Sequence, residues 1–217
     1  MNHKVIVFDF DGVIVESNGI KHDAFSSIFR RYPKYYKTMM SFHYEHNHLP
    51  RQDKFRYLVK ELMGKTDCED DVASLTYEFE GLTRQRIISC PYVAGARECI
   101  DYFSDRLPLY IVSATPEAEL MIILEARDMI KKFKGVYGPP MTKSHAFKTI
   151  IGQEQVAAFQ VLFVGDSIED YSVAKEAGIY FVARKTKENS FDAHIPICNN
   201  LSELKDLILD GSKPAWR

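Results

Sequence analysis

The chain has 217 residues, of which 46% are hydrophobic and 27% are charged, and its formal net charge is −2. This composition excludes a disordered chain, and the length allows one domain with a smaller insert. The small net charge favours neither a nucleic-acid partner nor a membrane surface, and no apolar run approaches the roughly 20 residues of a membrane helix. Four cysteines without a CxxC pair, and a start without a signal peptide, predict a reduced, cytoplasmic protein.

The first predicted strand lies in residues 5–13, VIVFDFDGV. Its apolar, β-favouring run is typical of a strand buried on both faces in a parallel sheet. Asp9 and Asp11 follow at the carboxyl end, and Gly12 allows a sharp turn. Because residues two apart in a strand point the same way, we expect both carboxylates to face one pocket. A cation between them would offset their repulsion.

The next part of the chain, residues 18–88, contains helical patterns and no convincing strand. Apolar residues recur at helical spacing in three segments, residues 19–31, 52–63 and 71–88. Residues 32–50 between them show little periodicity. We therefore expect residues 17–88 to form a small helical cap domain.

From residue 89 onward, buried strands alternate with helices. The predicted strands are residues 107–113, 135–138, 161–165 and 179–183, and the predicted helices are residues 96–104, 116–129, 144–151 and 172–177. This alternation predicts an α/β fold with a parallel sheet covered on both faces. Residues 1–16 and 89–217 are thus expected to form one core domain, with the cap inserted over the carboxyl ends of its strands.

Polar residues that suit phosphate chemistry follow several of these strands. They are Asp9, Asp11, Ser113, Ala114, Thr115, Asp166 and Asp170, with Lys143 at a helix start. Parallel strands bring such ends to one rim of the sheet. Carboxylates without clustered cysteines suit a hard cation, and Mg²⁺ is the expected one. A carboxylate can attack phosphorus, a second one can transfer the proton, and a hydroxyl and an ammonium can hold the phosphoryl oxygens.

The order of four motifs, DFDGV, IVSAT, Lys143 and GDSIEDYSVAKEAG, resembles the haloacid dehalogenase superfamily of phosphohydrolases. The insertion point of the helical segment resembles the subfamily related to phosphoglycolate phosphatase and β-phosphoglucomutase. The resemblance spans roughly residues 4–185 and implies a Rossmann-like three-layer α/β/α core with a helical cap. Dehalogenating relatives lack the second aspartate, so Asp11 favours phosphate-ester chemistry.

The resemblance also implies roles for single residues. Asp9 would be the nucleophile and Asp11 the general acid/base. Ser113 would bind the transferred phosphoryl group, with Ala114 and Thr115 beside it.

The resemblance also implies which residues stabilise charge and which bind the metal ion. Lys143 would stabilise the phosphoryl group and the nucleophile. Asp166 would bind Mg²⁺ together with the Asp9 side chain and the Asp11 main-chain carbonyl, and Asp170 would support the metal directly or through water.

These roles predict a Mg²⁺-dependent phosphatase, a phosphoric monoester hydrolase that acts on a small phosphorylated metabolite through an aspartyl-phosphate intermediate. A sugar phosphate is the candidate substrate. Two alternatives stay open, a sugar phosphomutase of the β-phosphoglucomutase type and a non-catalytic sensor of a phosphorylated ligand. The expected partner is the small-molecule phosphate ester, and the sequence does not indicate an oligomeric state.

Other residues have competing interpretations. Lys148 is an alternative to Lys143, but its helix turns Phe147 and Ile150 inward, which predicts that Lys148 is solvated.

In the cap, Arg51 and Lys54 either meet a substrate anion or are solvated surface charges. We expect His43, His46 and His48 to be solvated, because their spacing matches no structural zinc site. His22 is interpreted as packing or hinge support.

Overall fold

The computed structural model describes residues 3–46, 49–187 and 189–209. The chain divides into two compact units. The core unit comprises Met1–Glu16 and Cys90–Arg217, and the insert unit comprises Ser17–Ser89. The chain returns from the insert unit to the core unit after Ser89. This is one residue later than expected from the sequence, because the last helix of the insert unit continues through Ser89. His48 lies outside the described residues.

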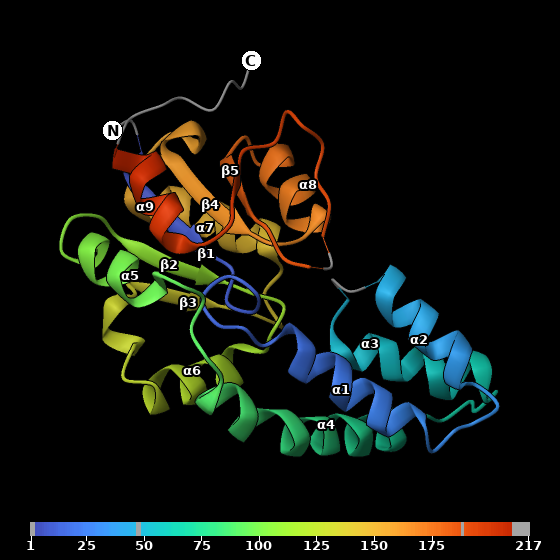
Figure 1. Cartoon of the computed structure of the whole chain (residues 1–217). Coiled ribbons are helices and arrows are strands. Elements are labelled where there is room, and N and C mark those ends of the chain that lie inside the picture. Colours follow the sequence, from blue (N-terminus) through green and yellow to red (C-terminus); the bar gives the residue numbers. More distant parts are fainter. Residues whose placement is uncertain (1–2, 47–48, 188, 210–217) are drawn as a thin grey trace. The chain divides into compact units, whose positions relative to one another are not determined.

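The core unit is built on a parallel sheet, as predicted (Figure 1). In the described residues its strands are β1 (Val5–Phe8), β2 (Leu109–Val112), β3 (Gly135–Tyr137), β4 (Val161–Gly165), β5 (Tyr180–Arg184) and β6 (Ile197–Cys198). They lie in the order β3-β2-β1-β4-β5-β6, and every neighbouring pair is parallel. The central strand β1 pairs with both β2 and β4, so the carboxyl ends of these three strands meet at one edge.

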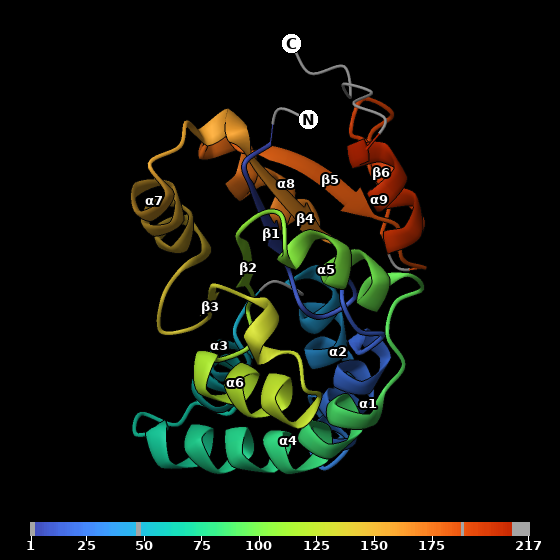
Figure 2. The ribbon, with the colours of Figure 1, turned by 90° about the vertical axis from the view of Figure 1, so that its left-hand side faces the viewer.

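Helices cover both faces of this sheet. They are α5 (Ala96–Ser104), α6 (Glu117–Ala126), α7 (Lys143–Glu154), α8 (Ile168–Glu176) and α9 (Leu201–Leu209), with 3₁₀ turns at Ile130–Lys132 and Ala158–Gln160. Figure 2 shows α7 on one side of the sheet and α5 with α9 on the other. Phe147 and Ile150 of α7 share an apolar core with Val7 and Phe163, whose side chains are fully buried. The predicted three-layer α/β/α arrangement is confirmed.

Local caps move several helix starts away from the sequence-based positions. α7 begins at Lys143, one residue earlier than predicted, because Thr142 caps it; the Thr142 hydroxyl accepts the His145 N–H at 3.3 Å. α8 begins at Ile168, four residues earlier than predicted, since Ser167 and Asp170 form a reciprocal capping box. Lys143 and Asp170 are therefore both in the first turns of their helices.

All the regular secondary structure in the described residues of the insert unit is helical. Its elements are α1 (Asn18–Phe29), α2 (Tyr36–Glu45), α3 (Arg51–Arg56), a π-helical turn η1 (Tyr57–Leu62) and α4 (Glu69–Ser89). α2 was missed in the sequence because its buried residues, Met39 and His43, give no apolar stripe. Phe25, Phe55 and Phe79 are buried together and form the aromatic centre of this unit.

Two stretches of chain join the units, and within the core unit they lie side by side. Val15 forms an antiparallel bridge with Tyr92, and the Glu16 N–H donates to the Pro91 carbonyl at 3.0 Å. The chain therefore leaves the core unit and re-enters it at neighbouring backbone positions.

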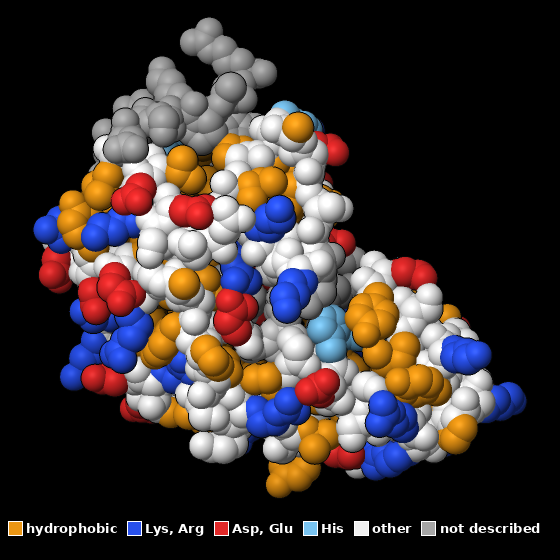
Figure 3. Space-filling model, viewed as in Figure 1, with side chains coloured by type: hydrophobic (Ala, Val, Ile, Leu, Met, Phe, Trp, Pro, Cys, Tyr) orange, Lys and Arg blue, Asp and Glu red, His pale blue; other side chains and the backbone are white. Residues whose placement is uncertain are grey.

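The surface carries charges of both signs. On the face in Figure 3, lysine and arginine side chains are interspersed with aspartate and glutamate side chains. No helix in the described part of the chain is long and apolar enough to span a membrane. All four cysteines are buried free thiols.

Candidate active site

Asp9 lies directly after the central strand β1, and its carboxylate is held on both oxygens. The Phe10 N–H donates to Asp9 Oδ1 at 2.6 Å, and Lys143 Nζ donates to Asp9 Oδ2 at 2.8 Å. Asp9 is 7% exposed. The end of β1 thus presents one oriented, nearly buried carboxylate at the edge where the parallel strands end.

Lys143 connects Asp9 with a second carboxylate. Its Nζ atom donates to Asp170 Oδ1 at 2.5 Å as well as to Asp9, and the Ser167 N–H donates to Asp170 Oδ2 at 3.2 Å. Lys148, the alternative lysine, is exposed on the same helix. The structure therefore places Lys143 beside Asp9, and Lys148 remains a surface residue.

The charges in this group shift one another's protonation. Burial raises the pKa of Asp9 from 3.8 to about 6, the Lys143 ammonium opposes that rise, and Asp170 adds to it. Burial opposes the charge on Lys143, but Asp170 and Asp9 raise its pKa above the ordinary lysine value. At neutral pH Lys143 is consequently an ammonium, and most of Asp9 is ionised.

A third carboxylate completes a cluster suited to a cation. Ligand oxygens of Asp9, Asp166 and Asp170 all lie within 4.8 Å of one another. Three carboxylates at this spacing are a donor set that fits a hard, oxygen-seeking divalent ion such as Mg²⁺. Asp166 comes from the loop after β4, so the cluster combines the ends of two neighbouring strands.

The Asp11 side chain has a different environment. Thr115 Oγ1 donates to Asp11 Oδ2 at 2.7 Å, and both residues are buried. The Thr115 N–H donates to Ser113 Oγ at 3.2 Å, which places the Ser113 hydroxyl at the end of β2 in the same turn; Ala114 between them is half-buried. Thr115 was expected to meet substrate, which stays a prediction; the structure adds a hydrogen bond from its hydroxyl to Asp11. No sequence signal connects the two residues, which are 104 positions apart.

Gly165 allows Asp170 to approach the sheet. A Cβ atom on Gly165 would lie 2.6 Å from Asp170 Cβ and 2.7 Å from Asp170 Oδ2, which is closer than real Cβ atoms come. Any side chain at this position at the end of β4 would displace Asp170 from Lys143.

We expect Gly165→Ala to destabilise the protein by about 1–3 kcal/mol, the usual cost of overpacking a tight site. Chemical denaturation monitored by circular dichroism measures this change. Gly152→Ala is the matched control, because a Cβ at this site in helix α7 meets nothing within 4 Å. It should be neutral or stabilising by up to about 1 kcal/mol. Equal stability of the two variants would contradict the close packing of Asp170 on Gly165.

Arg51 and Lys54 of α3 are buried, and so is His43 of α2. Lys54 Nζ lies 3.0 Å from His43 Nδ1 and 5.0 Å from the centre of the Phe25 ring. The Arg51 guanidinium lies 5.0 Å from the centre of the Phe79 ring. The prediction that His43 is solvated is wrong, and so is the alternative that Arg51 and Lys54 are solvated surface charges, because all three side chains are buried beside aromatic rings and polar neighbours. Their contact with a substrate anion stays a prediction.

Two histidines of the insert unit, His22 and His43, also contact each other. His22 Nδ1 lies 2.5 Å from His43 Nε2, so His22, His43 and Lys54 form one polar chain. Burial lowers the pKa of His43 to about 2, with Lys54 and His22 acting in the same direction. His43 is therefore neutral. His46 is half-buried and stacks on Phe42 with ring centres 4.2 Å apart.

The arrangement of Asp9, Lys143 and the acidic cluster can be compared with known proteins. The sequence profile of the haloacid dehalogenase-like hydrolases matches residues 6–184. The chain belongs to this family. The match covers both parts of the core unit and the insert unit between them. No curated protein sequence matches the chain significantly.

Solved structures of haloacid dehalogenase-like (HAD-like) proteins share the fold. A β-phosphoglucomutase from Clostridium difficile is 14% identical, with a TM-score of 0.75 over 96% of each chain. A predicted phosphoglycolate phosphatase from Haemophilus somnus 129PT is 18% identical, with a TM-score of 0.74 over 96% of this chain and 99% of the other. CbbY from Rhodobacter sphaeroides, in complex with phosphate, is 14% identical, with a TM-score of 0.70 over 93% of this chain and 96% of the other. These structures show that the chain shares the fold of HAD-like proteins, and the family match confirms the resemblance to the haloacid dehalogenase superfamily.

Proposed function

We propose that this HAD-like hydrolase is a Mg²⁺-dependent phosphatase that hydrolyses a small phosphomonoester, with a sugar phosphate as the candidate substrate. The observation that carries the proposal is the set of contacts around Asp9. One carboxylate at the end of the central strand is oriented by Lys143 and lies within 4.8 Å of ligand oxygens of two further carboxylates. Membership of a hydrolase family and a phosphate-bound structural relative are consistent with it.

In the first step an Asp9 carboxylate oxygen attacks the phosphorus atom and forms an aspartyl phosphate. The bond between phosphorus and the ester oxygen breaks, and that oxygen takes a proton from Asp11. Lys143 and the Ser113 hydroxyl donate hydrogen bonds to the phosphoryl oxygens. Bound through Asp9, Asp166, the Asp11 carbonyl and, directly or through water, Asp170, Mg²⁺ would neutralise charge on those oxygens.

In the second step Asp11 takes a proton from a water molecule, whose oxygen attacks the phosphorus. The bond to Asp9 breaks, which releases inorganic phosphate and restores the free carboxylate. Thr115 holds Asp11 by its hydroxyl and thereby sets the direction of both proton transfers. Arg51 and Lys54 contact Phe79, Phe25 and His43 of the insert unit. The phosphate-binding groups of the proposed mechanism are Lys143 and Ser113 of the core unit, and a contact of Arg51 or Lys54 with substrate stays a prediction.

A phosphate-release screen tests this proposal. The purified protein is incubated with Mg²⁺ and a panel of sugar phosphates, nucleotides, phosphoglycolate and amino-acid phosphates, and inorganic phosphate is measured colorimetrically. Activity should disappear with EDTA and return with excess Mg²⁺. Asp166→Asn should need more Mg²⁺ for the same rate. Conversion of a sugar 1-phosphate to the 6-phosphate without phosphate release, followed by ³¹P NMR, would establish the phosphomutase. If no member of the panel released phosphate, the result would favour the non-catalytic sensor of a phosphorylated ligand.

Thr115→Val is expected to lower kcat by about 10-fold or more, because a hydrogen bond to a charged group contributes about 1.5–3 kcal/mol. Steady-state kinetics at saturating Mg²⁺ measure this change. Thr115→Ser retains the hydroxyl and should behave like the unaltered protein; a valine variant with unchanged kinetics would contradict the role of Thr115.

A further inference from the structure

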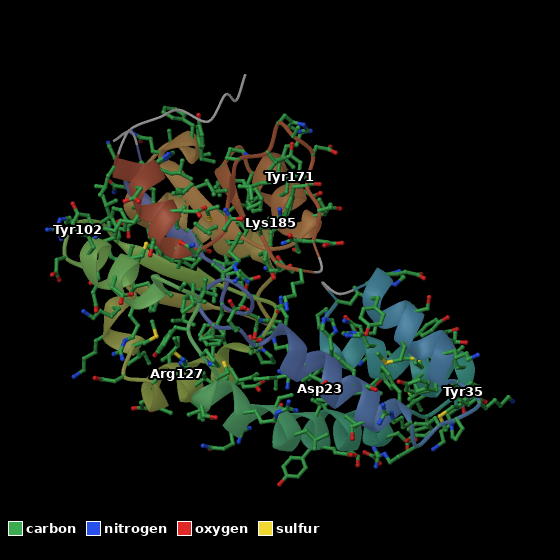
Figure 4. The ribbon with its side chains drawn as sticks, viewed as in Figure 1. Asp23, Tyr35, Tyr102, Arg127, Tyr171 and Lys185 are labelled. Atoms are coloured by element: carbon green, nitrogen blue, oxygen red, sulfur yellow. The ribbon has the colours of Figure 1, made fainter. Side chains whose placement is uncertain are left out.

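The carboxyl end of β5 contacts the loop that follows Asp11. Arg184, the last residue of β5, is buried, and its Nη1 donates to the Gly12 carbonyl at 3.1 Å. The same guanidinium binds both carboxylate oxygens of Glu16, at 3.2 Å from Nη1 and 2.5 Å from Nη2. In Figure 4 the label of Lys185, the next residue, marks this end of the strand. One side chain thus fixes both ends of the loop between Gly12 and Glu16.

The loop after β5 contacts the proposed metal ligand Asp166 in the same way. Asn189 Nδ2 donates to the Asp166 carbonyl and to the Arg184 carbonyl, each at 2.8 Å. Asn189 Oδ1 accepts the Thr186 N–H at 3.0 Å, so both the nitrogen and the oxygen of the Asn189 side-chain amide are hydrogen-bonded. Asn189 therefore links the Asp166 loop to the end of β5.

Together these contacts form one continuous connection. It runs from the Asp166 carbonyl through Asn189 to the Arg184 backbone, and from the Arg184 side chain to the Gly12 carbonyl. Gly12 follows Asp11 and has a left-handed backbone, with φ of 70°. A loop with such a turn can rotate its peptide groups unless a contact fixes them. The two loops that carry the proposed metal-binding groups are thus connected from outside the acidic cluster.

We propose that Arg184 and Asn189 are positioning residues that hold the Asp11 and Asp166 loops in the arrangement that binds Mg²⁺. The inference rests on the proposed function and adds to it a determinant of metal affinity outside the ligands themselves. Residues that orient metal ligands typically change metal affinity by about 10- to 100-fold when they are replaced.

The chemistry of both side chains suits this role. A planar guanidinium can bind a carboxylate with two parallel hydrogen bonds and still donate to a carbonyl, whereas the ammonium of lysine acts as a point charge. An amide offers two N–H donors for two carbonyl oxygens and one acceptor for an N–H. Arg184→Lys keeps the positive charge but loses the paired N–H donors of the guanidinium. Asn189→Ala removes the two N–H donors of the amide without adding a charge to the acidic cluster.

The test measures Mg²⁺ binding by isothermal titration calorimetry in the absence of substrate. We expect Arg184→Lys and Asn189→Ala to raise the Kd for Mg²⁺ by about 10-fold or more. Their melting temperatures in EDTA should stay close to that of the unaltered protein. In kinetics, the Mg²⁺ concentration for half-maximal rate should rise, while kcat at saturating Mg²⁺ recovers. A purely structural role would lower the melting temperature and leave the Kd of the folded protein unchanged.

Matched controls are Arg106→Lys and Asn199→Ala, exposed residues of the core unit whose side chains bond to Tyr102 and Glu203. Both should bind Mg²⁺ like the unaltered protein. If Arg184→Lys does not fold, Asn189→Ala decides the question. Variants that fold but have an unchanged Kd for Mg²⁺ would refute the positioning role of Arg184 and Asn189 and would leave the proposed function unaffected. If the unaltered protein itself binds no Mg²⁺ and releases no phosphate, the proposed function fails, and the inference fails with it.

Discussion

Replacement of Asp9 by asparagine is expected to reduce phosphate release by on the order of 10⁴-fold or more, as loss of a nucleophile does in other hydrolases. The amide cannot form the aspartyl phosphate, although its oxygen can still accept the Phe10 N–H. The fold should persist, because Lys143 keeps its contact with Asp170. Single-turnover assays with acid quenching measure both the rate and the loss of the phosphorylated intermediate.

The effect of Asp9→Asn on the stability of the metal-free protein has a predictable direction. Asp9 has a pKa of about 6 in the folded protein, above the ordinary value of 3.8. Its contribution therefore lowers the stability of the metal-free protein as pH rises from about 4 to 6, and asparagine removes that penalty. Asp23→Asn, which removes an exposed ion pair with Arg86, is the matched control and should leave the rate unchanged. Substantial phosphatase activity in Asp9→Asn would refute Asp9 as the nucleophile.

Lys143→Met is expected to lower both activity and stability. The methionine side chain preserves length but leaves the buried carboxylates of Asp9 and Asp170 without their shared cation. Breaking a buried ion pair typically costs about 3–5 kcal/mol. The pKa of Asp9 should rise further, because the Lys143 ammonium is the group that opposes its elevation.

The pH dependence separates this effect from simple loss of packing. A carboxyl group with a raised folded-state pKa destabilises the protein at high pH and stops doing so once it is protonated. The difference between Lys143→Met and the unaltered protein should therefore be largest above about pH 6 and shrink toward pH 4. Urea denaturation in EDTA at several pH values measures it. Lys148→Met, on the exposed side of the same helix, should change stability by less than about 0.5 kcal/mol. Equal stability of the two variants at pH 7.5 would contradict the pairing.

The parts of the fold that were predictable depend on local patterns. The apolar runs of β1, β2 and β4 end in polar residues, and alternation with helices implies parallel strands, so the common edge followed from the sequence. The contacts of Thr115 and Arg184 could not be predicted from the sequence, because their partners are distant in the chain and a hydroxyl or guanidinium indicates no particular partner. The two-residue strand β6 is too short for any periodicity.

The insert unit was less predictable than the core unit for a related reason. Lysine and arginine are rarely buried, so burial was not among the alternatives for Lys54 and Arg51, and His43 was expected to be solvated. Their burial depends on aromatic rings from α1 and α4 that meet only in the folded unit. Whether the insert unit covers the strand ends during catalysis stays a prediction.

The pairing of the two linkers has a consequence for how such a protein can be altered. Val15 bridges Tyr92, and Glu16 bonds Pro91, so the core unit itself closes the point where the insert begins and ends. The entropy of closing that loop grows only slowly with its length once the ends are joined. A segment of different size or sequence can therefore replace residues 17–89 without moving β1 or its aspartates. The paired linkers thus form one attachment point, at which inserts of different size can be joined to the same core unit.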